Sequence, residues 1–228
     1  MAQPQPASLA EQVYHRLKQD IFDFYLLPHD RFSENQIAER YQVSRTPVRD
    51  ALYRLEREGY LEVGFRRGWS VKPIDFSRID QLYEVRITLE SAAIEKLCVA
   101  QDVRELLAPL TATWLVEPAQ RETEMQVMAE LDEQFHCELL RLAGNSEMTR
   151  MHLEVCERIR IVRRLDFYKS HRIEQTYVEH ADILRMLAAR RKDECLRMLR
   201  AHIEQSRQEV HKISVSMLEA ARQFYCAG

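Results

Sequence analysis

The sequence predicts a mainly helical protein in two parts: three helices with a two-stranded antiparallel ribbon, then an antiparallel bundle of helices. The 228 residues contain only 5 glycines and 7 prolines, which favours helices with short connections over irregular loops. Between residues 33 and 71, two short amphipathic helical patterns precede an alternating segment with a basic turn. After residue 77 the apolar residues recur at helical spacing, without the alternation typical of strands.

The first part opens with a helix expected over residues 8–25. A second helix starts after Ser33, and Gln36 three residues on completes the pattern of a capping box. A third helix is capped by Ser44 and ends at Gly59, because glycine readily adopts the left-handed conformation that often follows a helix.

The ribbon follows directly. Residues 61–63 alternate like a short strand, and Val71 belongs to a second strand. The segment between them, residues 64–68, reads Gly-Phe-Arg-Arg-Gly. We therefore expect a hairpin with a basic tip.

The start of the third helix carries the chemistry of DNA recognition. Arg45, Thr46 and Arg49 occupy its first turn and a half, while its apolar residues lie on the other face. A helix N-terminus can meet phosphates, and arginines reach guanine edges in the major groove. Residues 44–72 contain seven Lys or Arg against four Asp or Glu, although the whole chain has a net charge of −3. The alternative is a solvated charged helix in an ordinary three-helix domain.

The second part is expected to contain six helices in an antiparallel bundle. Pro109 is expected to kink or shorten the second of them. Their predicted ranges are 77–100, 102–114, 119–143, 146–165, 172–190 and 193–224.

Four residues of the bundle form a candidate metal site. Asp132 and His136 are four positions apart, so their side chains leave one face of a helix. His180 and His202 lie in two other predicted helices, each near apolar residues. One carboxylate and three imidazoles would suit Zn²⁺, Ni²⁺, Mn²⁺ or Fe²⁺ rather than Ca²⁺ or Cu⁺. The alternative is that each histidine is simply exposed or hydrogen-bonded on its own.

Cysteine usage and hydropathy bear on the compartment. The five cysteines are widely spaced and include no C-x-x-C pair, which is typical of reduced thiols in a cytosol. No apolar run approaches the length of a membrane span, and the polar Pro/Gln segment 1–7 has no signal-peptide core. We therefore expect a cytoplasmic protein.

The run from Ser33 through Val71, with VSRTPVRDAL at its centre, resembles the winged helix-turn-helix of GntR-type bacterial transcription regulators. The resemblance covers about residues 8–73 and implies binding to operator DNA. To the implied contacts we add the two arginines of the wing tip, which we expect on phosphates. The DNA-binding residues expected are Asn35, Ser44, Arg45, Thr46, Arg49, Arg66, Arg67 and Gly68.

Residues 78 to about 220 resemble the all-helical FCD effector domain of the FadR-type branch. The likeness lies in LYEVRITLE at 82–90, LDEQFH at 131–136, Gly144-Asn145, Glu179-His180 and His202. It implies that Asp132, His136, His180 and His202 hold a divalent metal, with Zn²⁺ expected in the isolated protein, and that a carboxylate effector binds beside it.

Two residues are candidates for contacting that effector. Arg86 can fork onto a carboxylate, or it can pair with Glu90 four residues on. Asn145 can contact the same pocket, or it can end the third bundle helix in a left-handed conformation. Arg163 is expected at the surface rather than at the ligand.

The function expected is that of a ligand-responsive, sequence-specific transcription regulator, a repressor, acting as a homodimer on a pseudopalindromic operator. The alternatives are a regulator for which the metal itself is the signal, and a metal-dependent hydrolase. No enzyme activity is expected, because Glu133, next to the metal ligand Asp132, turns to another face of its helix. The domains expected are a disordered tail (1–7), a DNA-binding domain (8–73), a linker (74–77) and an effector domain (78–225).

Overall fold

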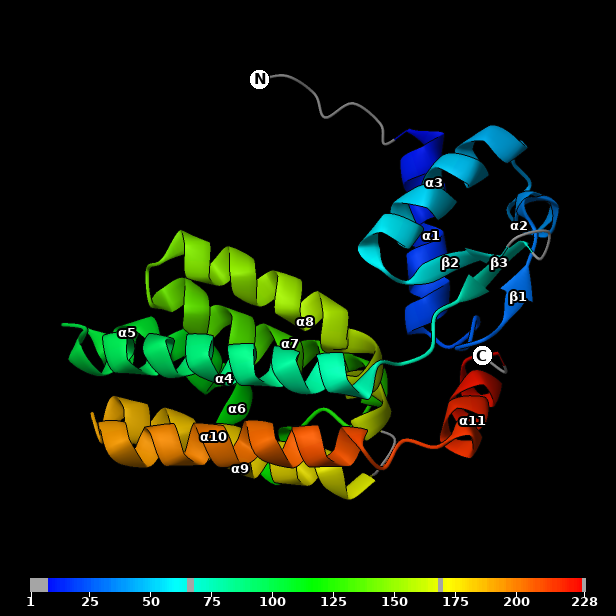
Figure 1. Cartoon of the computed structure of the whole chain (residues 1–228). Coiled ribbons are helices and arrows are strands. Elements are labelled where there is room, and N and C mark those ends of the chain that lie inside the picture. Colours follow the sequence, from blue (N-terminus) through cyan, green and yellow to red (C-terminus); the bar gives the residue numbers. More distant parts are fainter. Residues whose placement is uncertain (1–7, 65–67, 168–169, 227–228) are drawn as a thin grey trace. The chain divides into compact units, whose positions relative to one another are not determined.

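The computed structural model describes residues 8–64, 68–167 and 170–226, and it divides the chain into two units (Figure 1). The first unit combines the chain up to Asp75 with the segment from Ser214 onward, and the second is Phe76–Ile213. The fold is mainly helical, as predicted, and among the described residues the strands form one small antiparallel sheet, in the first unit.

The first unit is built on α3, which packs against both α1 and α2. Its core is formed by fully buried apolar residues of α1, α3 and the sheet: Leu17, Val48, Leu52, Leu55 and Leu61. The helices of this unit are α1 (Leu9–Phe22), α2 (Glu34–Tyr41), α3 (Arg45–Glu58) and α11 (Val215–Cys226).

The predicted helix ends are mostly confirmed. Ser33 and Gln36 form the predicted capping box of α2, and Gly59 takes a left-handed conformation after α3. Ser44 is the N-cap residue of α3, but its side chain makes no capping hydrogen bond. The first helix stops at Phe22, short of the predicted Tyr25, because Phe24 adopts a left-handed backbone with a φ of 62°.

The sheet has three strands instead of the two predicted. Its order is β1-β3-β2, with antiparallel pairing throughout, and its strands are β1 (Arg31–Phe32), β2 (Leu61–Gly64) and β3 (Gly68–Val71). Two residues are too few to show alternation, which is why β1 left no signal in the sequence. Gly68 is required by the fold: its φ is 72°, and an added Cβ would lie 2.7 Å from the Phe32 carbonyl oxygen.

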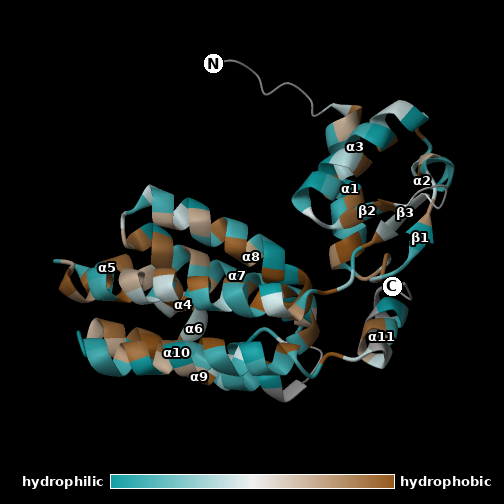
Figure 2. Cartoon of the chain, in the orientation of Figure 1, coloured by the Kyte–Doolittle hydropathy of each residue, from teal (hydrophilic) through white to brown (hydrophobic). Residues whose placement is uncertain are grey.

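The second unit is a helical bundle centred on α4, which contacts α7, α8, α9 and α10 (Figure 1). The side of α10 seen in Figure 2 is largely hydrophilic, as expected for the outer face of an amphipathic helix. The elements are α4 (Phe76–Val99), α5 (Val103–Leu106), α6 (Ala108–Trp114), the 3-10 helix η1 (Pro118–Gln120), α7 (Met125–Leu142), α8 (Ser146–Asp166), α9 (Ser170–Ala188) and α10 (Lys192–Val210).

Three predicted bundle helices are corrected. The helix predicted over 102–114 is two helices, and Pro109 lies in the first turn of the second, which begins at Ala108. The one predicted over 119–143 begins only at Met125, because Pro118–Gln120 forms a 3-10 turn. The last predicted helix breaks after Val210, and Ser214 accepts a hydrogen bond from Met217 N to start α11.

Within the described residues, no helix is both long enough and apolar enough to cross a bilayer.

Candidate metal centre and DNA-reading surface

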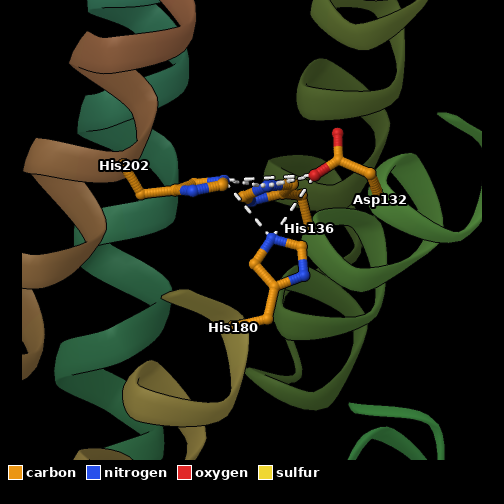
Figure 3. A group of neighbouring side chains, drawn as sticks. All are labelled: Asp132, His136, His180 and His202. Carbon is orange, nitrogen blue, oxygen red and sulfur yellow. Dashed lines mark hydrogen bonds and ion pairs between the residues drawn. The ribbon is translucent and has the colours of Figure 1, made fainter. Parts of the chain in front are cut away.

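The four residues predicted as metal ligands lie together inside the second unit (Figure 3). Asp132 and His136 come from α7, His180 from α9 and His202 from α10, and each is at most 5% exposed. One potential ligand atom from each residue lies within 4.8 Å of the others. The structure therefore brings together residues that are up to 70 positions apart in the chain.

The imidazoles turn the same nitrogen toward a common point. His202 Nε2 lies 3.1 Å from His136 Nε2 and 3.3 Å from His180 Nε2. The Asp132 carboxylate oxygen Oδ1 lies 3.3 Å from His180 Nε2 and 3.7 Å from His136 Nε2. Bonds of about 2.0–2.2 Å to one ion place neighbouring ligand atoms roughly 3–3.6 Å apart. The histidine nitrogens and the Asp132–His180 pair meet this spacing, whereas Asp132 Oδ1 is slightly farther from His136 and lies 4.0 Å from His202 Nε2.

Two of the histidines are oriented from behind by carboxylates. His136 Nδ1 lies 2.6 Å from Glu90 Oε2, and His202 Nδ1 lies 2.6 Å from Glu179 Oε2. A ring whose Nδ1–H donates to a carboxylate keeps its Nε2 lone pair free, as metal-bound histidines commonly do. The Nε2 lone pairs of His136 and His202 thus face each other, an arrangement that a cation between them stabilises.

The protonation states suit a cation as well. Burial lowers the pKa of His180 to about 3 and that of His202 to about 4, and it also lowers the pKa of His136. Burial by itself raises the pKa of Asp132, but the Arg163 guanidinium and the neighbouring histidines hold it well below its usual range. Near neutral pH the group is three neutral imidazoles and one carboxylate, a donor set that fits a divalent transition metal.

Aromatic rings wall the site. The Phe135 ring stacks on His180 with centroids 3.7 Å apart, and the Trp114 ring meets His180 edge-on at 4.2 Å. His180 Nδ1 is buried and has no hydrogen-bond partner in the described part of the chain. His180 is therefore held by packing, whereas His136 and His202 are held by hydrogen bonds.

The prediction for Arg163 is wrong. The residue is only 4% exposed, and its guanidinium pairs with the Asp132 carboxylate. The reason is tertiary, because α8 packs on α7 and turns this edge of the helix inward.

The two predicted effector contacts have structural roles in the described chain. Arg86 is 1% exposed, and its Nε donates to Glu90 Oε1 over 2.7 Å, which is the local pair named as the alternative. Its Nη2 is buried and has no hydrogen-bond partner among the described residues. This nitrogen can therefore donate to an acceptor on a ligand. Asn145 caps α8 by accepting from Met148 N, and the left-handed residue is its neighbour Gly144.

The predicted DNA-reading residues of α2 and α3 are exposed on the first unit: Asn35, Ser44, Arg45, Thr46 and Arg49. Arg66 and Arg67 lie outside the described residues. Glu34, which the sequence analysis did not consider, accepts from Arg45 Nη2 over 3.0 Å and from Arg49 Nη2 over 2.9 Å. One carboxylate thus holds both arginines beside the start of α3.

Sequence reasoning also missed the charged residues around the metal candidates. Glu90 was considered only as a partner of Arg86, and Glu179 only as the neighbour of His180. Arg172 is 4% exposed and donates to Glu179 over 3.0 Å. A buried charge must be paired with a partner. Acidic and basic residues on otherwise apolar helix faces were therefore the sequence signal that could have indicated these buried ion pairs.

Comparison with known proteins shows the family of each part of the chain. The model of bacterial regulatory proteins of the gntR family matches residues 9–71, and that of the FCD domain matches residues 81–205. The Nta operon transcriptional regulator of Aminobacter aminovorans is 32% identical over 190 residues, covering 83% of this chain and 89% of that protein. The HTH-type transcriptional repressor RspR of Escherichia coli is 24% identical and covers 89% of each chain. The solved structure of E. coli McbR/YncC, 22% identical, matches with a TM-score of 0.66 over 91% of this chain and 99% of that one, which shows the fold.

Proposed function

The chain belongs to the gntR family of bacterial regulatory proteins and carries an FCD domain, and we propose that it is a repressor. We further propose that its effector is an organic acid, which binds with the help of a metal ion. Family membership makes it a DNA-binding transcription regulator and not an enzyme. That a relative is named a transcriptional repressor supports the direction of control.

On the DNA side, we assign base reading to Arg45 and Arg49. Both are exposed at the N-terminal turn of α3, the part of a recognition helix that enters the major groove. Ser44 and Thr46 would bond phosphates, which fixes register without reading sequence. A homodimer with two-fold symmetry would place two such helices on the half-sites of a pseudopalindrome.

On the effector side, we assign a divalent metal to Asp132, His136, His180 and His202. The observation that carries this proposal is the convergence of three Nε2 atoms and one carboxylate oxygen in a buried space. When bound, the metal would supply a positive centre for a carboxylate effector. The free Nη2 of Arg86 gives that carboxylate a second anchor, since a guanidinium binds carboxylates through paired N–H groups.

Replacing His136 and His180 together by alanine tests the proposal. The double variant should lose stoichiometric metal by elemental analysis, whereas His211→Ala, an exposed histidine of the same unit, should keep it. In the wild type, a screen of organic acids should find one that changes the affinity for operator DNA. A chelator should abolish this change.

The arms of this experiment separate the alternatives. Full metal content in the double variant would show that the metal binds at other residues. If metal alone changed DNA binding and no organic acid altered it, the protein would be a metal sensor. If an organic acid still changed DNA binding after a chelator had removed the metal, the proposed role of the metal in effector binding would be wrong.

A further inference from the structure

A second buried group of ligand atoms lies beside the first and has no part in the proposed function. It consists of Cys137 on α7 with His152 and Cys156 on α8. Cys137 is 4% exposed, and the other two are fully buried. The Cys137 Sγ, a His152 ring nitrogen and the Cys156 Sγ all lie within 4.8 Å of one another.

The spacing suits a shared ion. His152 and Cys156 are four residues apart on one helix, and the neighbouring helix supplies the third ligand. His152 Nδ1 lies 3.6 Å from Cys156 Sγ and 3.9 Å from Cys137 Sγ. Bonds of about 2.3 Å to sulfur and about 2.0 Å to nitrogen at a tetrahedral angle place such atoms roughly 3.5–3.8 Å apart. Cys156 Sγ is also 3.6 Å from Nε2, so it lies beside the ring and must rotate about its Cα–Cβ bond to share an ion at Nδ1.

The hydrogen bonds around His152 favour binding at Nδ1. His152 Nε2 lies 2.9 Å from Glu90 Oε1, which leaves Nδ1 turned away from the carboxylate. Burial by itself lowers the pKa of His152, but hydrogen bonds to Cys156 and Glu90 raise it to about 9, so an ion bound at Nδ1 displaces a proton from that nitrogen. Glu90 orients His136 of the first site in the same way. Arg163 Nη1 approaches Cys156 Sγ at 3.9 Å, which compensates the charge of a thiolate.

The other described buried thiols show what an ordinary structural cysteine looks like in this fold. Cys195 donates to the carbonyl oxygen of Ile183 over 3.7 Å, and neither it nor Cys98 belongs to a group of potential metal ligands among the described residues. Buried cysteines commonly behave as small hydrophobic residues and need no histidine or carboxylate nearby. The histidine backed by Glu90 is what distinguishes Cys137 and Cys156.

We propose that Cys137, His152 and Cys156 form a second metal site, which takes a thiophilic ion, Zn²⁺ or Cu⁺. Thiolate ligands select these ions over the harder ones that suit the Asp/His₃ group. Binding would release the two thiol protons and the Nδ1 proton of His152. The three protein ligands would leave a further position on Zn²⁺ open or complete a trigonal Cu⁺ site. The inference does not depend on the first site being occupied.

Metal titration of the reduced full-length protein tests it, with Co²⁺ standing in for Zn²⁺ and with Cu⁺ under anaerobic conditions. At least one of the two ions should give a near-ultraviolet thiolate-to-metal charge-transfer band that saturates at one equivalent per chain. The band should vanish in the Cys137→Ser/Cys156→Ser variant. It should persist in Cys98→Ser/Cys195→Ser, the matched pair of buried cysteines, and in Asp132→Ala/His180→Ala, which removes the first site.

A negative result in the wild-type protein decides the matter even if a variant fails to fold. Absence of a thiolate band with both ions in folded wild type, or a band that survives loss of both Cys137 and Cys156, would overturn the proposal. Loss of the band in Asp132→Ala/His180→Ala with the thiols intact would overturn the independence of the two sites.

Discussion

Glu90 is the residue that joins the two buried groups. Its carboxylate is fully buried on α4, with Oε2 on His136 and Oε1 shared by Arg86 and His152. Burial by itself raises the pKa of Glu90, but the positive charges and hydrogen bonds around it hold the pKa well below its usual range. A permanent anion here fixes the orientation of one histidine in each group.

Replacing Glu90 by glutamine should weaken metal binding at the Asp/His₃ site by about 10–100-fold, the usual effect of losing a carboxylate behind a metal-bound histidine. An amide has one acceptor oxygen and would turn its NH₂ toward a partner that itself donates. Competition with a chelator of known affinity measures the change. Glu95→Gln, an exposed glutamate of the same helix, is the control, and equal affinities for the two variants would contradict the role of Glu90.

Arg49 is the residue on which the proposed base reading is tested. The Arg49 guanidinium lies on Glu34, so the proposed contact to a base would replace this ion pair. Arg49→Ala should cost about 1–3 kcal/mol of specific operator affinity at fixed salt. Arg150→Ala, a comparably exposed and ion-paired arginine of the second unit, should leave it unchanged. The proposed contact fails if both variants bind the operator like wild type.

At the scale of the element, α1 and α3 are tied together by a polar cluster as well as by their apolar faces. Lys18 is largely buried and donates to Tyr14 over 2.6 Å and to Glu58 over 2.7 Å. Burial by itself raises the pKa of Glu58, but the hydrogen bonds from Lys18 and Tyr14 leave it lowered. Because the folded state lowers this pKa, the stabilisation is present above the ordinary value of 4.5 and is lost as the pH falls through the folded value.

Glu58→Gln should therefore destabilise the first unit at pH 7 by about 1.5–3 kcal/mol, since a hydrogen bond to a buried charge is lost. The difference from wild type should shrink below pH 4.5. Urea unfolding followed by the fluorescence of Trp69, in a Trp114→Phe background, reports on this unit because the chain has 2 tryptophans. A difference that is constant from pH 7 to pH 3 would contradict the assignment.

Helices of the bundle were predictable where one apolar stripe runs the whole length of an element. This holds for α8, whose predicted range of 146–165 differs from the observed Ser146–Asp166 by one residue. The prediction of a single last helix was wrong because α10 and α11 belong to different units, so periodicity alone did not show the break. The strand β1 was missed since its pairing with β3 depends on contacts distant in the chain.

At the scale of the whole molecule, each unit contains one tryptophan that reports on it. Trp114 lies against His180, whereas Trp69 is buried in the sheet of the first unit. A ligand that binds only the folded state stabilises it by about 2.7 kcal/mol at one hundred times its dissociation constant. Metal bound to the Asp/His₃ site should therefore stabilise the second unit directly.

Removing metal with a chelator should lower the unfolding midpoint reported by Trp114 in a Trp69→Phe background. The midpoint reported by Trp69 in the Trp114→Phe background should change less, because its unit contains none of the proposed ligands. The His136→Ala/His180→Ala variant should show no chelator effect. An unchanged Trp114 midpoint in the Trp69→Phe background would exclude a stabilising metal at this site.

The sequence by itself determined the helical class, the N-terminal cap of α2 and the position of α3, because these follow from local spacing and side-chain chemistry. It also singled out the four candidate ligands, through the resemblance to the FCD domain more than through spacing. Only the tertiary structure decided which charges are buried and with whom they pair. The pairs that join different helices are Arg163 with Asp132, Glu179 with His202, and Glu90 with both His136 and His152. The physical reason is that a buried charge is tolerated only with a partner, and that partner is chosen by how the helices pack.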